Sequence, residues 1–298
     1  MEEPYAVIGR NPTAAASPTD QQSTIALAVG TPVTGPSTAT KLNHMQALTP
    51  YNPEAWHKWL SAANLTTQYP NIYDGLCFSF SANIPPLSQT FAPPNNPSIE
   101  EYKLIFNDIV NKEFTKGRYL GPFTQTEVEH ILGPFQTFPL SLVPKLGKPG
   151  KYRLVQNLSY PLSFFPVPSI NSLVNPDLFP SHYSTFTVVA LVISSLPPGS
   201  QGAVQDIAEA YHTIPLHHSQ WHMLVICLSD SEFAIDTSSC FGFAPSGGIY
   251  GSIGNMGMDI MHFNGIGPIL RWIDDHLFLR ILRTSLADYN THHAQTAQ

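Results

Sequence analysis

The sequence has little charge. Charged residues make up 12% of the 298 residues, and the formal net charge is -7. That share is about half of what an ordinary soluble protein carries. Proteins that bind nucleic acid usually have a positive surface, so this composition argues against a broad basic binding face. Any contact with phosphate must therefore come from a local cluster of Lys and Arg.

Cysteine is also scarce, and long apolar runs are missing. The three cysteines, Cys77, Cys227 and Cys240, match no metal-ligand spacing, and we expect them to be buried, reduced thiols. The longest apolar stretch, Phe186–Leu196, is too short to span a bilayer and is interrupted by serine. We therefore expect an intracellular protein with no membrane association, in the nucleus or the cytoplasm. The sequence indicates no oligomeric state.

The first half of the chain is predicted to be largely helical. Residues 1–45 are rich in Thr, Ala, Pro, Ser and Gly, and we expect them to be disordered. Asn52 followed by Pro53 is typical of a helix start. Two pairs have capping-box spacing and predict further helix starts, one that runs on to Gly117 and one that ends at Gly133. These pairs are Ser98 with Glu101 and Thr124 with Glu127.

The second half is predicted to contain hairpins and two helices. Three pairs of strands are expected, at 140–144 with 152–156, 222–228 with 232–236, and 269–273 with 276–281. A short strand is expected at 203–206, and helices are expected at 184–196 and 246–262. The glycines of the segment 251–257 favour close helix packing over a phosphate loop. This order predicts an α+β fold with an antiparallel sheet.

Asp274 and Asp275 are adjacent acids at the predicted turn of the last hairpin. Their charges repel each other, and a divalent cation would offset this repulsion because Mg²⁺ prefers carboxylate oxygens. Taken alone, the pair is better explained as a solvated turn. Asp206 changes this interpretation, because it ends a predicted strand and could reach a neighbouring turn. Three such acids can hold two cations for in-line phosphoryl transfer.

Four segments resemble the motifs of reverse transcriptases and occur in that family's order. Asp206 with Tyr211 resembles the first palm motif, and 241–248 resembles the second. Residues 272–275, Trp-Ile-Asp-Asp, resemble the third, and 148–159 resemble the segment of the fingers that grips the incoming triphosphate. Within the family, the chain is most similar to polymerases of tyrosine-recombinase (DIRS-like) retroelements.

The resemblance implies an RNA-directed DNA polymerase that uses Mg²⁺ or Mn²⁺, an RNA or DNA template-primer and deoxynucleoside triphosphates. It implies that the metal ligands and catalytic residues are Asp206, Asp274 and Asp275. It also implies that the nucleotide is bound by Lys145, Lys148, Arg153, Tyr211, Gly247 and Gly248. Tyr211 would exclude a ribose 2′-hydroxyl, and Arg153 would contact triphosphate oxygens. A local excess of Lys and Arg over Glu within 112–153 agrees with phosphate contacts there.

The resemblance also implies a division of the chain. We expect an N-terminal helical extension at 46–119, a fingers-like region at 120–200, a palm with the acids at 201–283, and a frayed tail at 284–298. A thumb is absent from this division, and we expect a polymerase truncated after the Asp-Asp motif.

Two alternatives stay open. The chain could be a catalytically inactive nucleic-acid-binding remnant of a retroelement polymerase, which the low basicity favours. It could also be an unrelated metal-dependent hydrolase, which would leave Tyr211 and the basic hairpin unexplained. The histidines between 212 and 222 have no cysteine or acid partner at zinc-site spacing, so we expect ordinary surface or core histidines.

Overall fold

A computed structural model describes residues 48–162 and 167–296. The predicted disorder of residues 1–45 lies outside the described residues. The α-helices are α3 (Pro53–Ala62), α4 (Ile72–Phe78), α5 (Ser98–Glu101), α6 (Lys103–Thr115), α7 (Gln125–Leu132), α8 (Phe186–Ser195), α9 (Ser246–Phe263) and α10 (Arg283–Thr296). Short 3₁₀ helices lie at η1 (Ile170–Leu173), η2 (Pro176–Leu178), η3 (Ala210–Thr213) and η4 (His218–Met223).

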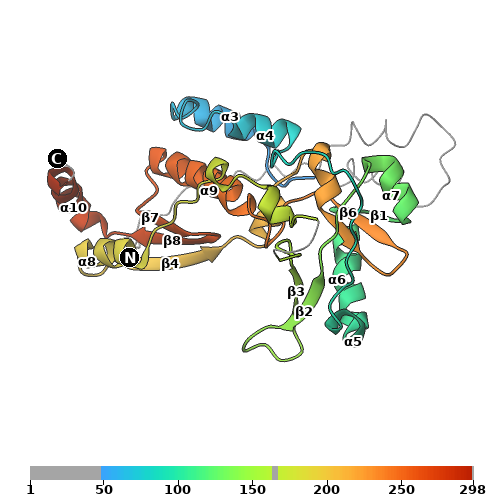
Figure 1. Cartoon of the computed structure of the whole chain (residues 1–298). Helices are drawn as coiled ribbons and strands as arrows, with labels where there is room; N and C mark the ends of the chain where they lie inside the picture. The colour runs from blue at the N-terminus through green and yellow to red at the C-terminus, as the bar shows by residue number, and fades with distance from the viewer. Residues whose placement is uncertain (1–47, 163–166, 297–298) are drawn as a thin grey trace.

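Within the described residues, the strands form two three-stranded sheets and one hairpin, and every ladder is antiparallel. They are β1 (Tyr119–Phe123), β2 (Leu140–Pro144), β3 (Tyr152–Gln156), β4 (Gln201–Asp206), β5 (Val225–Cys227), β6 (Phe233–Asp236), β7 (Ile269–Trp272) and β8 (Asp275–Arg280). The sheet orders are β1-β6-β5 and β4-β8-β7, and the hairpin is β2-β3. The predicted α+β class with antiparallel sheets is confirmed. Figure 1 shows the two sheets at opposite ends of the molecule, with the hairpin projecting between them.

The helix starts illustrate how local sequence sets the fold. Asn52 accepts a hydrogen bond from the Ala55 backbone N–H at 3.0 Å, as predicted for an N-cap. The capping box of Thr124 with Glu127 is also present at the start of α7. The capping box predicted for Ser98 is wrong.

The Ser98 hydroxyl is used elsewhere. It accepts a hydrogen bond from the Leu142 backbone N–H of β2 at 3.0 Å. The helix is divided into α5 and α6, with a break at Tyr102, whose backbone has φ -114° and ψ 40°. A tertiary contact has therefore overridden a local capping signal.

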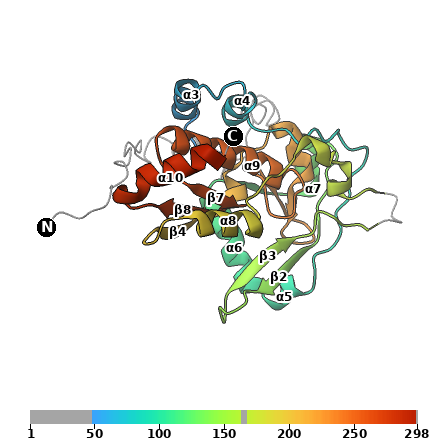
Figure 2. The ribbon, with the colours of Figure 1, turned by 90° about the vertical axis from the view of Figure 1, so that its left-hand side faces the viewer.

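The described residues form three clusters of buried apolar side chains, and two of these clusters are large. The larger core joins α6, the hairpin and the β1-β6-β5 sheet through buried side chains that include Phe106, Leu140 and Ile235. The second core joins α3, α4, η3 and α9, and Figure 2 shows α3 and α4 covering α9. The helices within 46–119 therefore contribute to both cores.

The β4-β8-β7 sheet is packed less completely. Helix α9 lies against β7, yet all six residues of β4 are exposed and α8 has no buried residue. Beyond β8, the chain continues as α10, within the segment for which we expected a frayed tail. None of the helices in the described ranges is long and apolar enough to cross a membrane. Cys227 and Cys240 are buried and Cys77 is partly buried, and no disulfide joins any of them within the described residues.

Candidate metal and nucleotide site

The ladder between β4 and β8 brings two of the predicted acids together. Its six consecutive pairs run from Gln201 opposite Arg280 to Asp206 opposite Asp275. Directly paired residues in an antiparallel ladder have Cα atoms about 4.5–5.5 Å apart, and their side chains project from the same face. Asp206 and Asp275 are therefore neighbours at one end of this sheet, although they are distant in the sequence.

Asp274 lies in the turn next to this pair. Trp272 pairs with Asp275, so the turn that joins β7 to β8 contains two residues, Ile273 and Asp274. The prediction that both acids lie in the turn is wrong for Asp275, which begins β8. The Asp274 carbonyl accepts a hydrogen bond from the Ile207 N–H at 3.1 Å, which fixes the turn to the residue that follows β4. The backbone thus collects all three acids at the end of β4.

The electrostatic environment disfavours a charge on Asp274. Partial burial raises the pKa of Asp274, and the negative charges of Asp206 and Asp275 raise it further. A divalent cation would reverse this effect, because it favours the ionised carboxylates. Carboxylate oxygens are the ligands that Mg²⁺ prefers, so a cation beside this turn stays a prediction.

In this conformation, the three carboxylates are not arranged as a set of metal ligands. Within the described ranges, no group of three or more His, Cys, Asp or Glu side chains is placed so that it could hold a metal ion. Asp206 and Asp275 are exposed, so their carboxylates have room to rotate. Holding a cation would require such rotation, without any change in the strand register.

Tyr211 lies close to the acids. It is 9% exposed in η3, and its ring packs against Phe241 at 4.5 Å and Tyr250 at 5.9 Å between centroids. Burial, followed by the charges of Tyr183 and Asp274, raises the pKa of Tyr211. The structure therefore packs this ring in the core beside the Asp-Asp turn, where Ile273 contacts the same cluster.

The two glycines at the start of α9 lie beside this tyrosine. A Cβ at Gly247 would lie 3.2 Å from the Ser181 hydroxyl, and a Cβ at Gly248 would lie 2.3 Å from the Phe179 carbonyl oxygen. Gly248 is thus needed for close packing of α9 against the segment at Phe179, whether or not a nucleotide binds. Its role toward a nucleotide stays a prediction.

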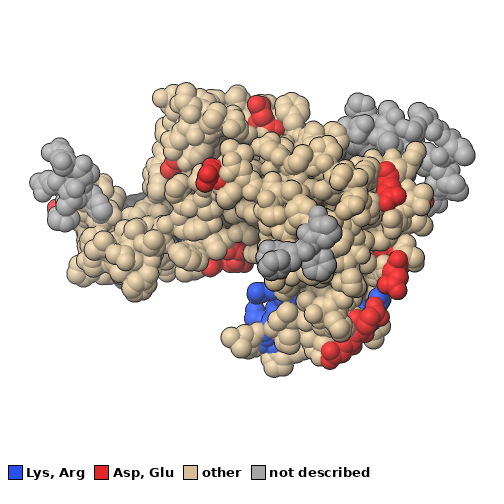
Figure 3. Space-filling view, viewed as in Figure 1, with Lys and Arg blue, Asp and Glu red and all other residues tan. Residues whose placement is uncertain are grey.

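The basic residues of the hairpin form a separate group. Lys145, Lys148 and Arg153 are exposed, and the loop is closed by a backbone hydrogen bond from Lys145 to Lys151 at 2.8 Å. Figure 3 shows Lys and Arg side chains gathered over β2 and β3, while Asp and Glu lie over α5 and α6. None of the ion pairs among the described residues joins these hairpin cations to the three acids. The two groups are thus carried by different elements.

An ionic network beside the acids was not predicted from the sequence. Glu209 follows β4 with a left-handed φ of 56° and pairs with both Lys116 and Arg118. Partial burial acts to raise the pKa of Glu209, but the hydrogen bonds and charges of these two cations lower it to about 2. Glu113 completes the network through Arg118 at 3.4 Å. The network connects the residues after β4 to the end of α6.

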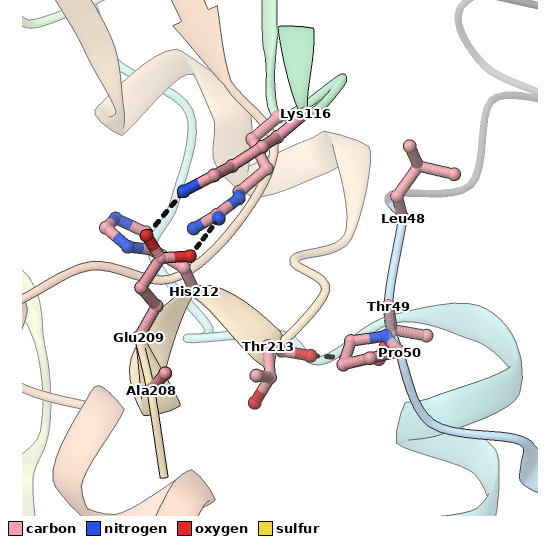
Figure 4. Close-up of a pocket in the computed structure, with 9 residues that line it drawn as sticks. Leu48, Thr49, Pro50, Lys116, Ala208, Glu209, His212 and Thr213 are labelled. Atoms are coloured by element: carbon pink, nitrogen blue, oxygen red, sulfur yellow. Dashed lines mark hydrogen bonds and ion pairs between the residues drawn. The ribbon is translucent and has the colours of Figure 1, made fainter. Parts of the chain in front are cut away.

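Lys116, Arg118 and Glu209 line a pocket of about 410 Å³ that also includes His212 and residues 48–50 (Figure 4). Burial, followed by the charge of Arg118, lowers the pKa of His212 to about 4, so the imidazole is neutral at pH 7. Because the pocket's two cations already share Glu209, we attribute a structural role to the network.

Comparisons with known proteins give a likeness in shape only. No protein-family model matches the chain, and no curated protein matches it. The structure is similar to the native protease-reverse transcriptase of prototype foamy virus, with a TM-score of 0.45, 12% identity and coverage of 85% of this chain. For the selenomethionine-labelled CSH mutant of that protein, the TM-score is 0.46, the identity is 14%, and the coverage of this chain is 86%. This chain spans 32% and 30% of those two chains, and values this low do not assign a function.

Proposed function

We propose that the chain is a reverse-transcriptase-like domain that performs template-directed nucleotidyl transfer. Asp206, Asp274 and Asp275 would hold Mg²⁺ or Mn²⁺ and would be the catalytic carboxylates. One cation would activate a primer 3′-hydroxyl, and the other would neutralise the triphosphate and the leaving pyrophosphate. The observation that carries the proposal is the pairing of Asp206 with Asp275, with Asp274 in the adjoining turn.

The surrounding residues support this assignment. Tyr211 packs between Phe241 and Tyr250 beside the turn, where it could select deoxynucleotides by excluding a 2′-hydroxyl. Lys145, Lys148 and Arg153 are exposed on a hairpin and could contact triphosphate oxygens. Gly247 and Gly248, the last two residues of the second motif, lie in the first turn of α9. The partners would be an RNA or DNA template-primer and deoxynucleoside triphosphates. The sequence motifs favour a retroelement of the tyrosine-recombinase type as the source.

Primer extension tests the proposal directly. The wild-type protein is expected to extend a labelled primer on an RNA or a DNA template in Mg²⁺ or Mn²⁺. Asp274→Asn should reduce incorporation by at least about 100-fold, because even residues that only support metal ligands contribute 10–100-fold. The matched control is Asp230→Asn in the exposed turn between β5 and β6, which should leave incorporation unchanged. Equal incorporation by wild type and Asp274→Asn would refute the assignment.

A second candidate is a nucleic-acid-binding domain without catalysis. The exposed hairpin favours it, because Lys145, Lys148 and Arg153 lie on a different element from the acids. This candidate predicts RNA binding that weakens with salt, and removing one cation that binds a phosphate should reduce the salt slope by about one. Lys148→Ala and Arg153→Ala should each reduce that slope, and Lys58→Ala on the exposed face of α3 should not. Such binding without nucleotide incorporation would select this candidate.

A further inference from the structure

Arg271 is a buried cation with no carboxylate partner among the described residues. It lies on β7, three positions before Asp274, and is 1% exposed. None of the ion pairs in the described ranges includes it, and its Nε has no hydrogen-bond partner. Burying a guanidinium among neutral groups is costly, so its position calls for a specific explanation.

The guanidinium joins three segments that are distant in the sequence. Its Nη1 donates to the Ile273 carbonyl at 2.7 Å. Its Nη2 donates to the His182 carbonyl at 3.0 Å, the Gly251 carbonyl at 3.1 Å and Asn255 Oδ1 at 2.7 Å. One side chain therefore connects the turn of the acids to α9 and to the segment before α8.

Helix α9 is shaped to accept this side chain. A Cβ at Gly254 would lie 2.9 Å from both Cδ and Nε of Arg271, which is closer than real contacts allow. The Tyr183 ring lies 5.4 Å from the guanidinium carbon, and the Ser184 N–H donates to the Arg271 carbonyl at 2.8 Å. The guanidinium is thus enclosed by glycine, an aromatic ring and backbone.

The carbonyl that Nη1 holds belongs to a strained residue. Ile273 has a φ of 55°, in the left-handed region that a β-branched residue rarely adopts. Glycine usually fills such a position in a two-residue hairpin turn. Strain of this kind persists only where neighbouring groups impose it. Here Arg271 fixes the Ile273 carbonyl, and the Ile207 N–H fixes the Asp274 carbonyl.

We propose that Arg271 is a positioning residue for the Asp-Asp turn. By holding Ile273 in the left-handed conformation, it keeps Asp274 and Asp275 beside Asp206. This proposal rests on the proposed function for the purpose of the acids, but the conformation of the turn can be measured independently of any cation.

The first measurement addresses the turn alone. In protein labelled with ¹³C and ¹⁵N at isoleucine, the Cα and carbonyl shifts of Ile273 report its backbone conformation, and the signal is assigned by its loss in Ile273→Val. Arg271→Met should move these shifts away from left-handed values. Arg271→Lys should cause a smaller change in the same shifts. The matched control, Arg280→Met at the opposite end of the neighbouring strand, should leave them unchanged. Unchanged shifts in a folded Arg271→Met protein would overturn the proposal.

The second measurement links the turn to cation binding. Electron paramagnetic resonance of free Mn²⁺ gives the affinity, which Arg271→Met should weaken by about 10–100-fold. Adding Ile273→Gly to that variant should restore most of the affinity, because glycine adopts a positive φ without support. A folded double variant that recovers nothing would overturn the link. Absence of Mn²⁺ binding by the wild type would instead refute the proposed metal site. The Cα and carbonyl chemical shifts of Ile273 would then decide the role of Arg271.

Discussion

The two three-stranded sheets have the same antiparallel arrangement but opposite environments. In the β1-β6-β5 sheet, every residue of β5 and β6 is buried, and the surrounding core includes Phe138 and Trp221 at 0% and 1% exposure. In the β4-β8-β7 sheet, every residue of β4 is exposed. Local stability follows buried apolar contact, so the first sheet should open only with global unfolding. The second carries the acids and should open more readily.

The acids of the two sheets differ in the same way. Asp236 on β6 is 0% exposed, and burial raises its pKa well above the usual range. One of its carboxylate oxygens has no hydrogen-bond partner. Asp206 and Asp275 stand at the exposed end of their ladder, where solvent and ions can reach them. A buried acid mainly affects stability, whereas an exposed cluster of acids can serve a ligand.

The largest expected effect compares two leucines. Leu224, which precedes β5, is 0% exposed, and Leu191 on α8 is 64% exposed. Leu224→Ala should reduce the free energy of unfolding by about 2–5 kcal/mol, because it leaves a cavity. Leu191→Ala should change it by less than about 0.5 kcal/mol. Urea denaturation followed by far-UV circular dichroism measures both. Similar losses in the two variants would contradict the contrast between the sheets.

A smaller effect is expected at Asp236. Its folded-state pKa lies above the unfolded value of about 3.8, so its contribution to stability is complete below that pH and is lost as pH rises through the folded pKa. Asp236→Asn should therefore stabilise the protein at pH 8 by about 1–3 kcal/mol, and much less at pH 4. Melting temperatures at the two pH values test this. Asp230→Asn, at an exposed turn, is the control, and equal gains at both pH values would disagree with a buried neutral acid.

A substitution at Glu209 tests the ionic network that connects the residues after β4 to the end of α6. Its pKa is lowered to about 2 from 4.5, so its stabilising effect is present above about pH 4.5 and is lost as pH falls toward about 2. The Glu209 side chain is 47% exposed, so Glu209→Gln should cost no more than about 1 kcal/mol at pH 7. The cost should shrink under acid conditions. Glu232→Gln, in an exposed turn, should show neither effect, and a pH-independent cost at Glu209 would contradict the ionic interpretation.

The smallest effect is expected on β4 itself. Val204 is 69% exposed, so Val204→Thr should change the free energy of unfolding by less than about 0.5 kcal/mol. The same denaturation experiment measures it at several protein concentrations. A large loss, especially one that depends on concentration, would mean that another surface covers this strand in solution.

The sequence predicted much of this architecture because the relevant signals are local. The Thr124 capping box, the three hairpins and the small-residue helix all depend on neighbours a few residues apart, and all are present. The close packing predicted for the glycines of α9 is confirmed at Gly254. The acids were found by their position at strand ends, and their pairing followed once the ladder was known.

The features that the sequence did not reveal depend on contacts between distant segments. Ser98 has the spacing of a capping box, but its hydroxyl accepts from β2 instead. Arg271 precedes an Asp-Asp turn and resembles a surface charge, yet its partners lie on α9 and before α8. The same is true of Asp236, whose burial follows from the sheet around it. No pattern of neighbouring residues encodes these contacts.

The pairing register of β4 with β8 determines which acids lie side by side in the site. Side chains on a strand alternate between faces, so a slip of one residue would turn Asp275 toward the side opposite Asp206. A single inserted or deleted residue within either strand would have that result even if every acid were retained. Homologous chains that share the proposed activity should therefore vary freely in loop length while keeping both strands free of insertions.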